Sequence, residues 1–170
     1  MPRVWNVTSD TNIAAFVCDI PAENNGLRRF RGAGCHPNHA IALARALTEA
    51  AQIRLTYITG NRDDLPPSDY EETAREKLGG ALLDAASQAV EPLSFHDAVT
   101  FEEGDLALDV QWELNCLRSV GIEQAIAIDL TLSDFGIPVI KMVVPSLEWD
   151  CTHPNYTPGV RAHSATRNDR

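Results

Sequence analysis

The sequence predicts an α+β fold, in which a mixed or antiparallel sheet carries about three helices packed on it. Two observations lead to this class. Runs of strand-forming residues stand near both ends of the 170-residue chain, at 4–8, 13–20, 125–131 and 137–144. Between them lies an alanine-rich stretch with helical periodicity at 38–59. Strands at both ends with helices between them are typical of a layered sheet-and-helix fold.

The terminal strands are predicted to form two similar hairpins. A Ser-Asp pair, followed by isoleucine and proline at fixed distances, occurs from Ser9 to Pro21 and again from Ser133 to Pro145. Each Ser-Asp pair, helped by Asn12 or by Gly136, is typical of a turn between two strands. We expect both hairpins to lie in one sheet. Chance similarity is the alternative explanation for so few matched positions.

The elements between the hairpins follow in order. A short strand is expected at 27–34, and its glycines, Gly32 and Gly34, favour a close strand-to-helix turn over a phosphate-binding loop, because no complete nucleotide-loop motif is present. The main helix is expected from Pro37 or Asn38 to residues 59–60. A polar loop at 61–68 leads to a second helix at about 68–88.

A third helix is predicted at 105–120, ended by Gly121. The segment after Trp149 is polar and contains Pro154 and Pro158. We therefore expect one domain at 1–150 and an irregular tail at 151–170.

Composition restricts the kinds of partner. The formal net charge is −10, which disfavours nucleic acid or an anionic membrane as an electrostatically bound partner. No apolar run has the length of a membrane span, and the N-terminus lacks the apolar core of a secretory signal. Four scattered cysteines without a C-x-x-C pair are expected to be reduced thiols, which indicates a cytoplasmic protein.

One face of the main helix carries an unusual polar stripe. Arg45, Glu49 and Gln52 fall close together at about 100° per residue, while Leu43 and Leu47 lie on the far side. A cation, a carboxylate and an amide in a row suit a charged ligand, and we expect the stripe to turn toward a cavity. The alternative is the solvent face of an ordinary amphipathic helix.

Two other clusters are weaker candidates. Cys35, His36 and His39, together with Cys151 and His153, have the side chains of a zinc site, but their spacing matches no standard zinc motif. Cys35 or Cys151 could also act as a nucleophile paired with a histidine, but no sequence motif of such enzymes surrounds either residue. Core cysteines and histidines at a helix start explain both clusters.

The main helix and the segment that follows it resemble a known family. The segment AIALARALTEAAQIR followed by ITGNRDDL is similar to the YcaO superfamily over roughly thirty residues, polar positions included. The phrase from Asp129 to Val139 resembles a second family pattern, D-L-T-x-x-D-x-G-I-P-V. The resemblance implies the C-terminal half of a YcaO-like domain. It also implies an ATP-dependent enzyme that activates a peptide backbone amide by phosphorylation, for azoline cyclodehydration or thioamidation.

The resemblance also implies the site. Glu49 would bind Mg²⁺ and Gln52 would contact the nucleotide, with Arg54 and Arg62 as partners of nucleotide or phosphate. No catalytic residue is implied by it. A carboxylate is a suitable ligand for a hard cation.

The implied partners are a peptide substrate and either a partner protein or an N-terminal half that carries further acidic ligands; a homodimer is also expected. The absence of a P-x-P-x-P ending favours a thioamide-forming or an uncharacterised branch of the family over ring formation. The competing hypothesis is a catalytically silent domain that dimerises or binds a peptide.

Overall fold

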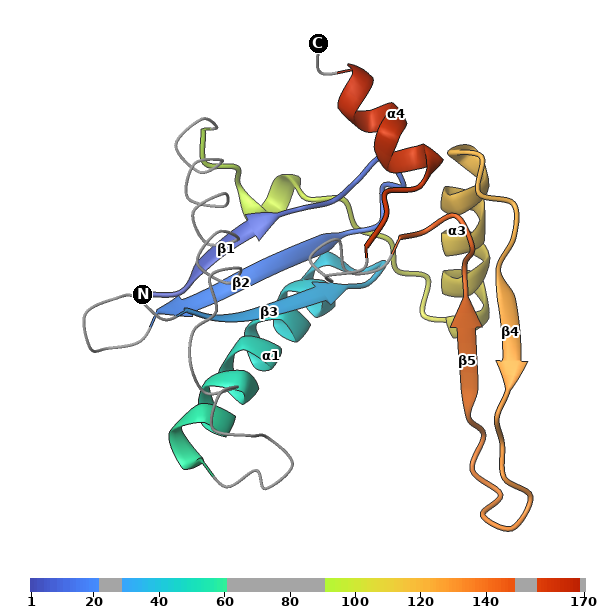
Figure 1. Cartoon of the computed structure of the whole chain (residues 1–170), viewed down its shortest axis with the longest axis horizontal. Helices are drawn as coiled ribbons and strands as arrows, with labels where there is room; N and C mark the ends of the chain where they lie inside the picture. The colour runs from blue at the N-terminus through green and yellow to red at the C-terminus, as the bar shows by residue number, and fades with distance from the viewer. Residues whose placement is uncertain (22–28, 61–90, 149–155, 169–170) are drawn as a thin grey trace. The chain divides into compact units, whose positions relative to one another are not determined.

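The computed structural model describes residues 1–21, 29–60, 91–148 and 156–168 (Figure 1). Contacts divide the chain into two compact units, 1–116 and 117–170. The elements of the first are β1 (Arg3–Asn6), β2 (Ala15–Pro21), β3 (Arg29–Cys35), α1 (His39–Thr59) and the short 3-10 helix η2 (Phe95–Asp97). Helix α3 (Leu106–Ser119) crosses the boundary, and β4 (Ile126–Asp129), β5 (Ile140–Val143) and α4 (Val160–Asn168) follow. The predicted α+β class is confirmed.

Both predicted hairpins are present, and all strand pairs are antiparallel. They form two separate sheets where one shared sheet was expected, a three-stranded sheet in the order β1-β2-β3 and a two-stranded sheet of β4 and β5. The edge of β2 that faces away from β1 pairs with β3 and not with the second hairpin. Cys18 of β2 therefore lies between Val4 of β1 and Gly32 of β3.

The two hairpins close with corresponding hydrogen bonds, although the loop of the second is one residue longer. In the first, the Val7 N–H donates to the Ala15 carbonyl at 2.9 Å, and the Ala15 N–H donates to Thr8 Oγ1 at 3.1 Å. In the second, the Leu130 N–H donates to the Val139 carbonyl at 2.8 Å, and the Val139 N–H donates to Thr131 Oγ1 at 3.0 Å.

The resemblance extends to the end of the first strand and to the turn. The Thr8 N–H donates to Asn6 Oδ1, as the Thr131 N–H donates to Asp129 Oδ1. Each turn also contains one residue in the left-handed region, Asn12 at φ 59° and Gly136 at φ 60°. Asparagine and glycine are the residues that adopt this conformation most readily.

Helix α1 begins and ends where the sequence predicts. Asn38 Oδ1 accepts from the N–H groups of Ala40 and Ile41 at 2.8 and 3.4 Å, and Gly60 ends the helix at φ 58°. These are the expected N-cap and C-cap devices. The helix covers one face of the three-stranded sheet (Figure 1).

The contact between α1 and the sheet is made by small residues. The fully buried alanines of the helix pack with Phe16 and Cys18 of β2; they are Ala42, Ala46 and Ala50. A Cβ at Gly32 would overlap the main chain of Ala46 and Ala50, and one at Gly34 would overlap that of Ala42. Glycine is therefore required so that β3 can lie directly against the helix.

The third predicted helix is confirmed as α3. Asp105 Oδ1 accepts from the Ala107 N–H at 2.8 Å, which caps the helix start, and Gly121 follows its end at φ 79°. The predicted second helix at 68–88 lies outside the described residues.

The expectation of an irregular tail at 151–170 is wrong for residues 160–168, which form α4. The helix start is capped from outside, since Glu148 Oε1 accepts from the N–H groups of Gly159 and Ala162 at 3.0 and 3.3 Å. Tyr156 also donates to this carboxylate. A carboxylate at a helix N-terminus compensates the unpaired N–H groups and the positive end of the dipole. Nothing within 151–170 itself reveals this cap.

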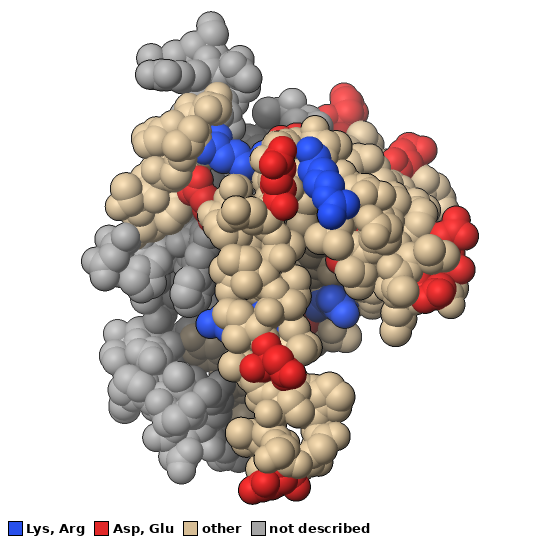
Figure 2. Space-filling model, turned by 90° about the vertical axis from the view of Figure 1, so that its right-hand side faces the viewer, with Lys and Arg blue, Asp and Glu red and all other residues tan. Residues whose placement is uncertain are grey.

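On the face shown in Figure 2, charged side chains are sparse and scattered among uncharged ones. The net charge of −10 therefore does not gather into one acidic patch on that face. Each helix of the described ranges is too short or too polar to cross a bilayer.

Candidate functional site

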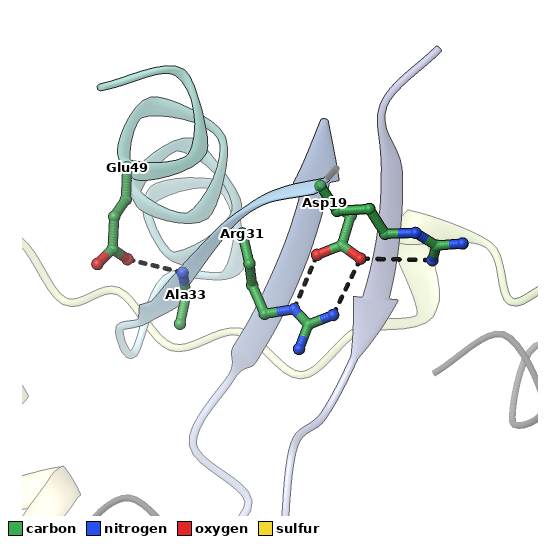
Figure 3. A network of polar contacts seen from close by, with 5 residues as sticks. Asp19, Arg31, Ala33 and Glu49 are labelled. Carbon is green, nitrogen blue, oxygen red and sulfur yellow. Dashed lines mark hydrogen bonds and ion pairs between the residues drawn. The ribbon is translucent and has the colours of Figure 1, made fainter. Parts of the chain in front are cut away.

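Glu49 is held against the edge of the sheet. Its Oε2 accepts a hydrogen bond from the main-chain N–H of Ala33 at 2.7 Å (Figure 3). The pairing of β2 with β3 explains this contact. The His36 N–H donates to the Ala14 carbonyl at 3.0 Å, and along antiparallel strands hydrogen-bonded residue pairs alternate with pairs that are not hydrogen-bonded. Ala33 therefore points its N–H away from β2, toward the outer edge of β3.

Arg45, one turn earlier on α1, contacts the same outer edge of β3. Its Nη1 donates to the carbonyl of Cys35 at 3.2 Å. Two side chains of opposite charge on the helix thus occupy two outward main-chain groups of β3. Charged side chains over an edge strand are a common means of preventing unwanted strand pairing, so part of the polar stripe has a structural role.

The structure places the other predicted residues differently. Gln52 is exposed on the same stripe, one turn beyond Glu49, and its side chain makes no hydrogen bond to the described residues. Arg54 is half-buried on another side of α1. Arg62 lies outside the described residues.

The stripe does not turn into a cavity within the described ranges, since Arg45, Glu49 and Gln52 are all exposed. The buried face of α1 is its alanine face, which packs directly against the glycines of β3. Glu49 borders that face, and its carboxylate turns back to the strand.

Glu49 fits a magnesium ligand in one respect. Its second oxygen, Oε1, makes no hydrogen bond to the described residues, so a hard donor atom is available. The described residues contain no group of three histidine, cysteine, aspartate or glutamate side chains that could hold a metal. A single carboxylate agrees with the usual Mg²⁺ mode, in which one or two carboxylates act with phosphate oxygens and waters.

The cysteine–histidine cluster is explained by structural contacts. His36 Nδ1 accepts from the Asn38 N–H at 3.0 Å, and His39 lies within 3.0 Å of the Ala98 carbonyl and against the Phe95 ring. Burial, and then the charge of Glu113, raises the pKa of Cys35. A raised pKa disfavours the thiolate that a nucleophile needs. Cys151 and His153 lie outside the described residues.

One polar network was not found from the sequence. Asp19 is only 2 % exposed, and it accepts from Arg31 Nε and Nη2 at 2.8 and 3.1 Å (Figure 3). Arg29 Nη1 lies 3.7 Å from the same carboxylate. Only the register, which sets Asp19 opposite Arg31, brings these residues together. The available signals were the alternation of Arg29 and Arg31 with uncharged residues, and Asp19 as the one charge within the apolar run 15–21.

Comparison with known proteins identifies the family of the chain. The family model described as YcaO cyclodehydratase, ATP- and Mg²⁺-binding, matches residues 2–148. An uncharacterised protein from the tfuA 3′ region of Rhizobium leguminosarum bv. trifolii is 31 % identical over 95 % of this chain and 40 % of its own length. An uncharacterised protein of Methanothermobacter thermautotrophicus is also 31 % identical, over 84 % of this chain and 38 % of its own. The chain thus spans about two fifths of the length of these relatives.

Two solved structures share the fold. A heterocyclase in complex with substrate and cofactor has a TM-score of 0.68 and 25 % identity over 86 % of this chain and 20 % of its own. The YcaO protein of Methanopyrus kandleri bound with AMPPCP and Mg²⁺ has a TM-score of 0.62 and 19 % identity, over 83 % of this chain and 37 % of its own. The family model covers most of the sequence, and the chain therefore belongs to the YcaO family.

Proposed function

We propose that this chain contributes a Mg²⁺–ATP contact to a YcaO-type enzyme that activates a peptide backbone amide. The observation that carries the proposal is the carboxylate of Glu49, which is anchored through one oxygen to Ala33 and leaves the other available. The family description, which includes ATP and Mg²⁺ binding, supports these two ligands for the chain. ATP and Mg²⁺ are the proposed cofactors, and a peptide is the proposed substrate.

In the reaction, the amide carbonyl oxygen forms a bond to the γ-phosphorus of ATP, and the bond to ADP breaks. A neighbouring side chain or a sulfur donor then adds to the amide carbon, and phosphate leaves with the former carbonyl oxygen. Mg²⁺, when bound, would offset the charge on the transferring phosphoryl group. Azoline formation and thioamidation share these steps, and both remain within the proposal.

The residues of the stripe have separate roles. Glu49 supplies a fixed negative oxygen for the metal, and Gln52 supplies an amide that donates to and accepts from the nucleotide. Arg54 and Arg62 are proposed as further phosphate or nucleotide contacts. The proposed cellular compartment is the cytoplasm, where the thiols of residues such as Cys18 and Cys35 would stay reduced.

The test is Mg²⁺-dependent ATP binding, measured by calorimetry. Glu49→Ala and Gln52→Ala should each weaken binding at least about tenfold, whereas the neighbouring Thr48→Ala should stay within about twofold. Thr48 is a matched control because its hydroxyl bonds only to carbonyls of its own helix. Equal affinity in all four proteins would refute the site.

A second candidate function, a catalytically silent domain that dimerises or binds a peptide, is favoured by a different observation. The β4–β5 hairpin exposes apolar side chains on both faces, with Ile128 41 %, Ile140 54 % and Met142 56 % exposed. A two-stranded hairpin is marginally stable without a cover. Absence of nucleotide binding at millimolar ATP would favour this candidate.

A further inference from the structure

We infer that the main-chain N–H of Ala33 is a positioning group for Glu49, and that it fixes the carboxylate in the orientation in which Oε1 receives the metal–nucleotide complex. The inference rests on the proposed function and adds to it a group that is not a side chain. A flexible glutamate loses rotamer entropy when it binds a ligand. A donor that holds the side chain beforehand removes part of that cost.

The bond has the features of a strong positioning contact. It joins an ionised acceptor to an N–H donor at 2.7 Å, within the range of charge-assisted hydrogen bonds. It engages Oε2 alone, and Glu49 makes no second hydrogen bond in the described part of the chain. The anchoring oxygen and the available oxygen are therefore different atoms of one carboxylate.

The sequence places this N–H within reach through its two glycines. Gly32 and Gly34 flank Ala33, and a Cβ on Gly32 would lie 2.9 Å from the Cβ of Glu49. A larger residue at either position would push β3 away from α1 and lengthen the bond. The glycines thus serve the site by bringing strand and helix together, without themselves cradling a phosphate.

The N–H of Ala33 can be removed without breaking a hydrogen bond between β2 and β3. Because it points outward, Ala33→Pro eliminates the donor while the β2–β3 ladder keeps its bonds, and proline is tolerated on an edge strand in this orientation. Cys35→Pro is the matched control. Cys35 also follows a glycine and has its main-chain groups directed outward, and its carbonyl, which Arg45 uses, is retained.

The experiment is calorimetric titration of the whole chain with AMPPCP and Mg²⁺. Ala33→Pro should raise the Kd about tenfold, the usual effect of losing a hydrogen bond to a charged group, while Cys35→Pro should change it less than about twofold. Circular dichroism establishes that both variants are folded. Wild-type affinity in folded Ala33→Pro would overturn the positioning role and leave the proposed function standing.

A second readout does not depend on a proline variant. In the unaltered chain, the amide resonance of Ala33 should shift when AMPPCP is added with Mg²⁺, and much less without Mg²⁺. In Glu49→Ala, the same resonance should lose its response. An unmoved Ala33 resonance while nucleotide binds would overturn the role. Absence of any nucleotide binding by the unaltered chain would instead overturn the proposed function, and this role with it.

Discussion

At the scale of single residues, Asp19 is the most deeply buried charge of the sheet. Its side chain is 3 % exposed, while those of Arg31 and Arg29 are 36 % and 25 % exposed. Breaking a buried pair by removing one partner is costly, because the other charge remains without compensation. Here the arginines reach solvent, which lowers that cost.

Asp19→Ala should reduce the free energy of unfolding by about 2–3 kcal/mol, below the full cost of breaking a fully buried pair because water screens the arginines. Urea unfolding monitored by circular dichroism measures the change. Glu103→Ala, at an exposed carboxylate before α3, should change stability by less than about 0.5 kcal/mol. Equal losses in the two variants would contradict the role of the ion pair.

Sequence reasoning succeeded for residues whose role depends on local spacing and failed for those that depend on register. Glu49 and Gln52 were placed on one face because helical periodicity is local. The pairing of Asp19 with Arg31 requires knowledge of which strands are neighbours and of their alignment. Only the tertiary contact shows that α1 buries its alanine face, while Arg45, Glu49 and Gln52 are exposed within the described residues. That the stripe faces a cavity stays a prediction.

At the scale of elements, the junction between β3 and α1 determines the geometry of the candidate site. The helix was predicted nearly to the residue because Asn38 and Gly60 are strong local signals. The glycines of β3 were predicted to permit a turn, and the structure shows that they permit close packing along the strand instead.

Gly32→Ala should destabilise the protein by about 1–3 kcal/mol, because the added methyl group overlaps the main chain of α1 and forces the elements apart. Thermal unfolding provides the measurement. Ala33→Ser is the control, since residue 33 is exposed and its side chain points to the other face of the sheet. An unchanged melting temperature in Gly32→Ala would show that helix and strand are not in direct contact.

Helix α4 should depend on pH through Glu148. Hydrogen bonds, first from Tyr156 and then from the Gly159 N–H, hold the pKa of this carboxyl below its usual range. Because the folded-state pKa is the lower one, the stabilisation is complete above the unfolded-chain value of about 4.3 and is lost as pH falls through the folded value. The protection of the Gly159 and Ala162 amides from exchange, relative to the intrinsic rate at each pH, should therefore fall on acidification.

Glu148→Gln provides the comparison for that measurement. Glutamine keeps an acceptor oxygen but cannot be protonated in this range, so the protection of the two amides from exchange should become nearly independent of pH. The same acid response in both proteins would assign the effect to another group.

At the scale of the whole molecule, the chain corresponds to about two fifths of its curated relatives, and its β4–β5 hairpin has apolar faces open to solvent. If the proposed homodimer forms through this hairpin, sedimentation should show a concentration-dependent mass. Ile140→Lys should shift the chain toward the monomer, because a charge at the centre of an apolar contact is costly to desolvate. Lys141→Ile, on the opposite face, should not do so. A monomer at all concentrations would contradict the dimer.

The matching closure of the two hairpins has a consequence for how the chain folds. The contacts that select each alignment lie within a few positions of one another along the sequence, as with Thr8 and Ala15. Hairpins of this kind form in about 1–10 μs, well before distant segments meet. We therefore expect the β1–β2 hairpin to form early, with Phe16 and Cys18 already on one face, so that β3 and α1 can pack against that face afterward.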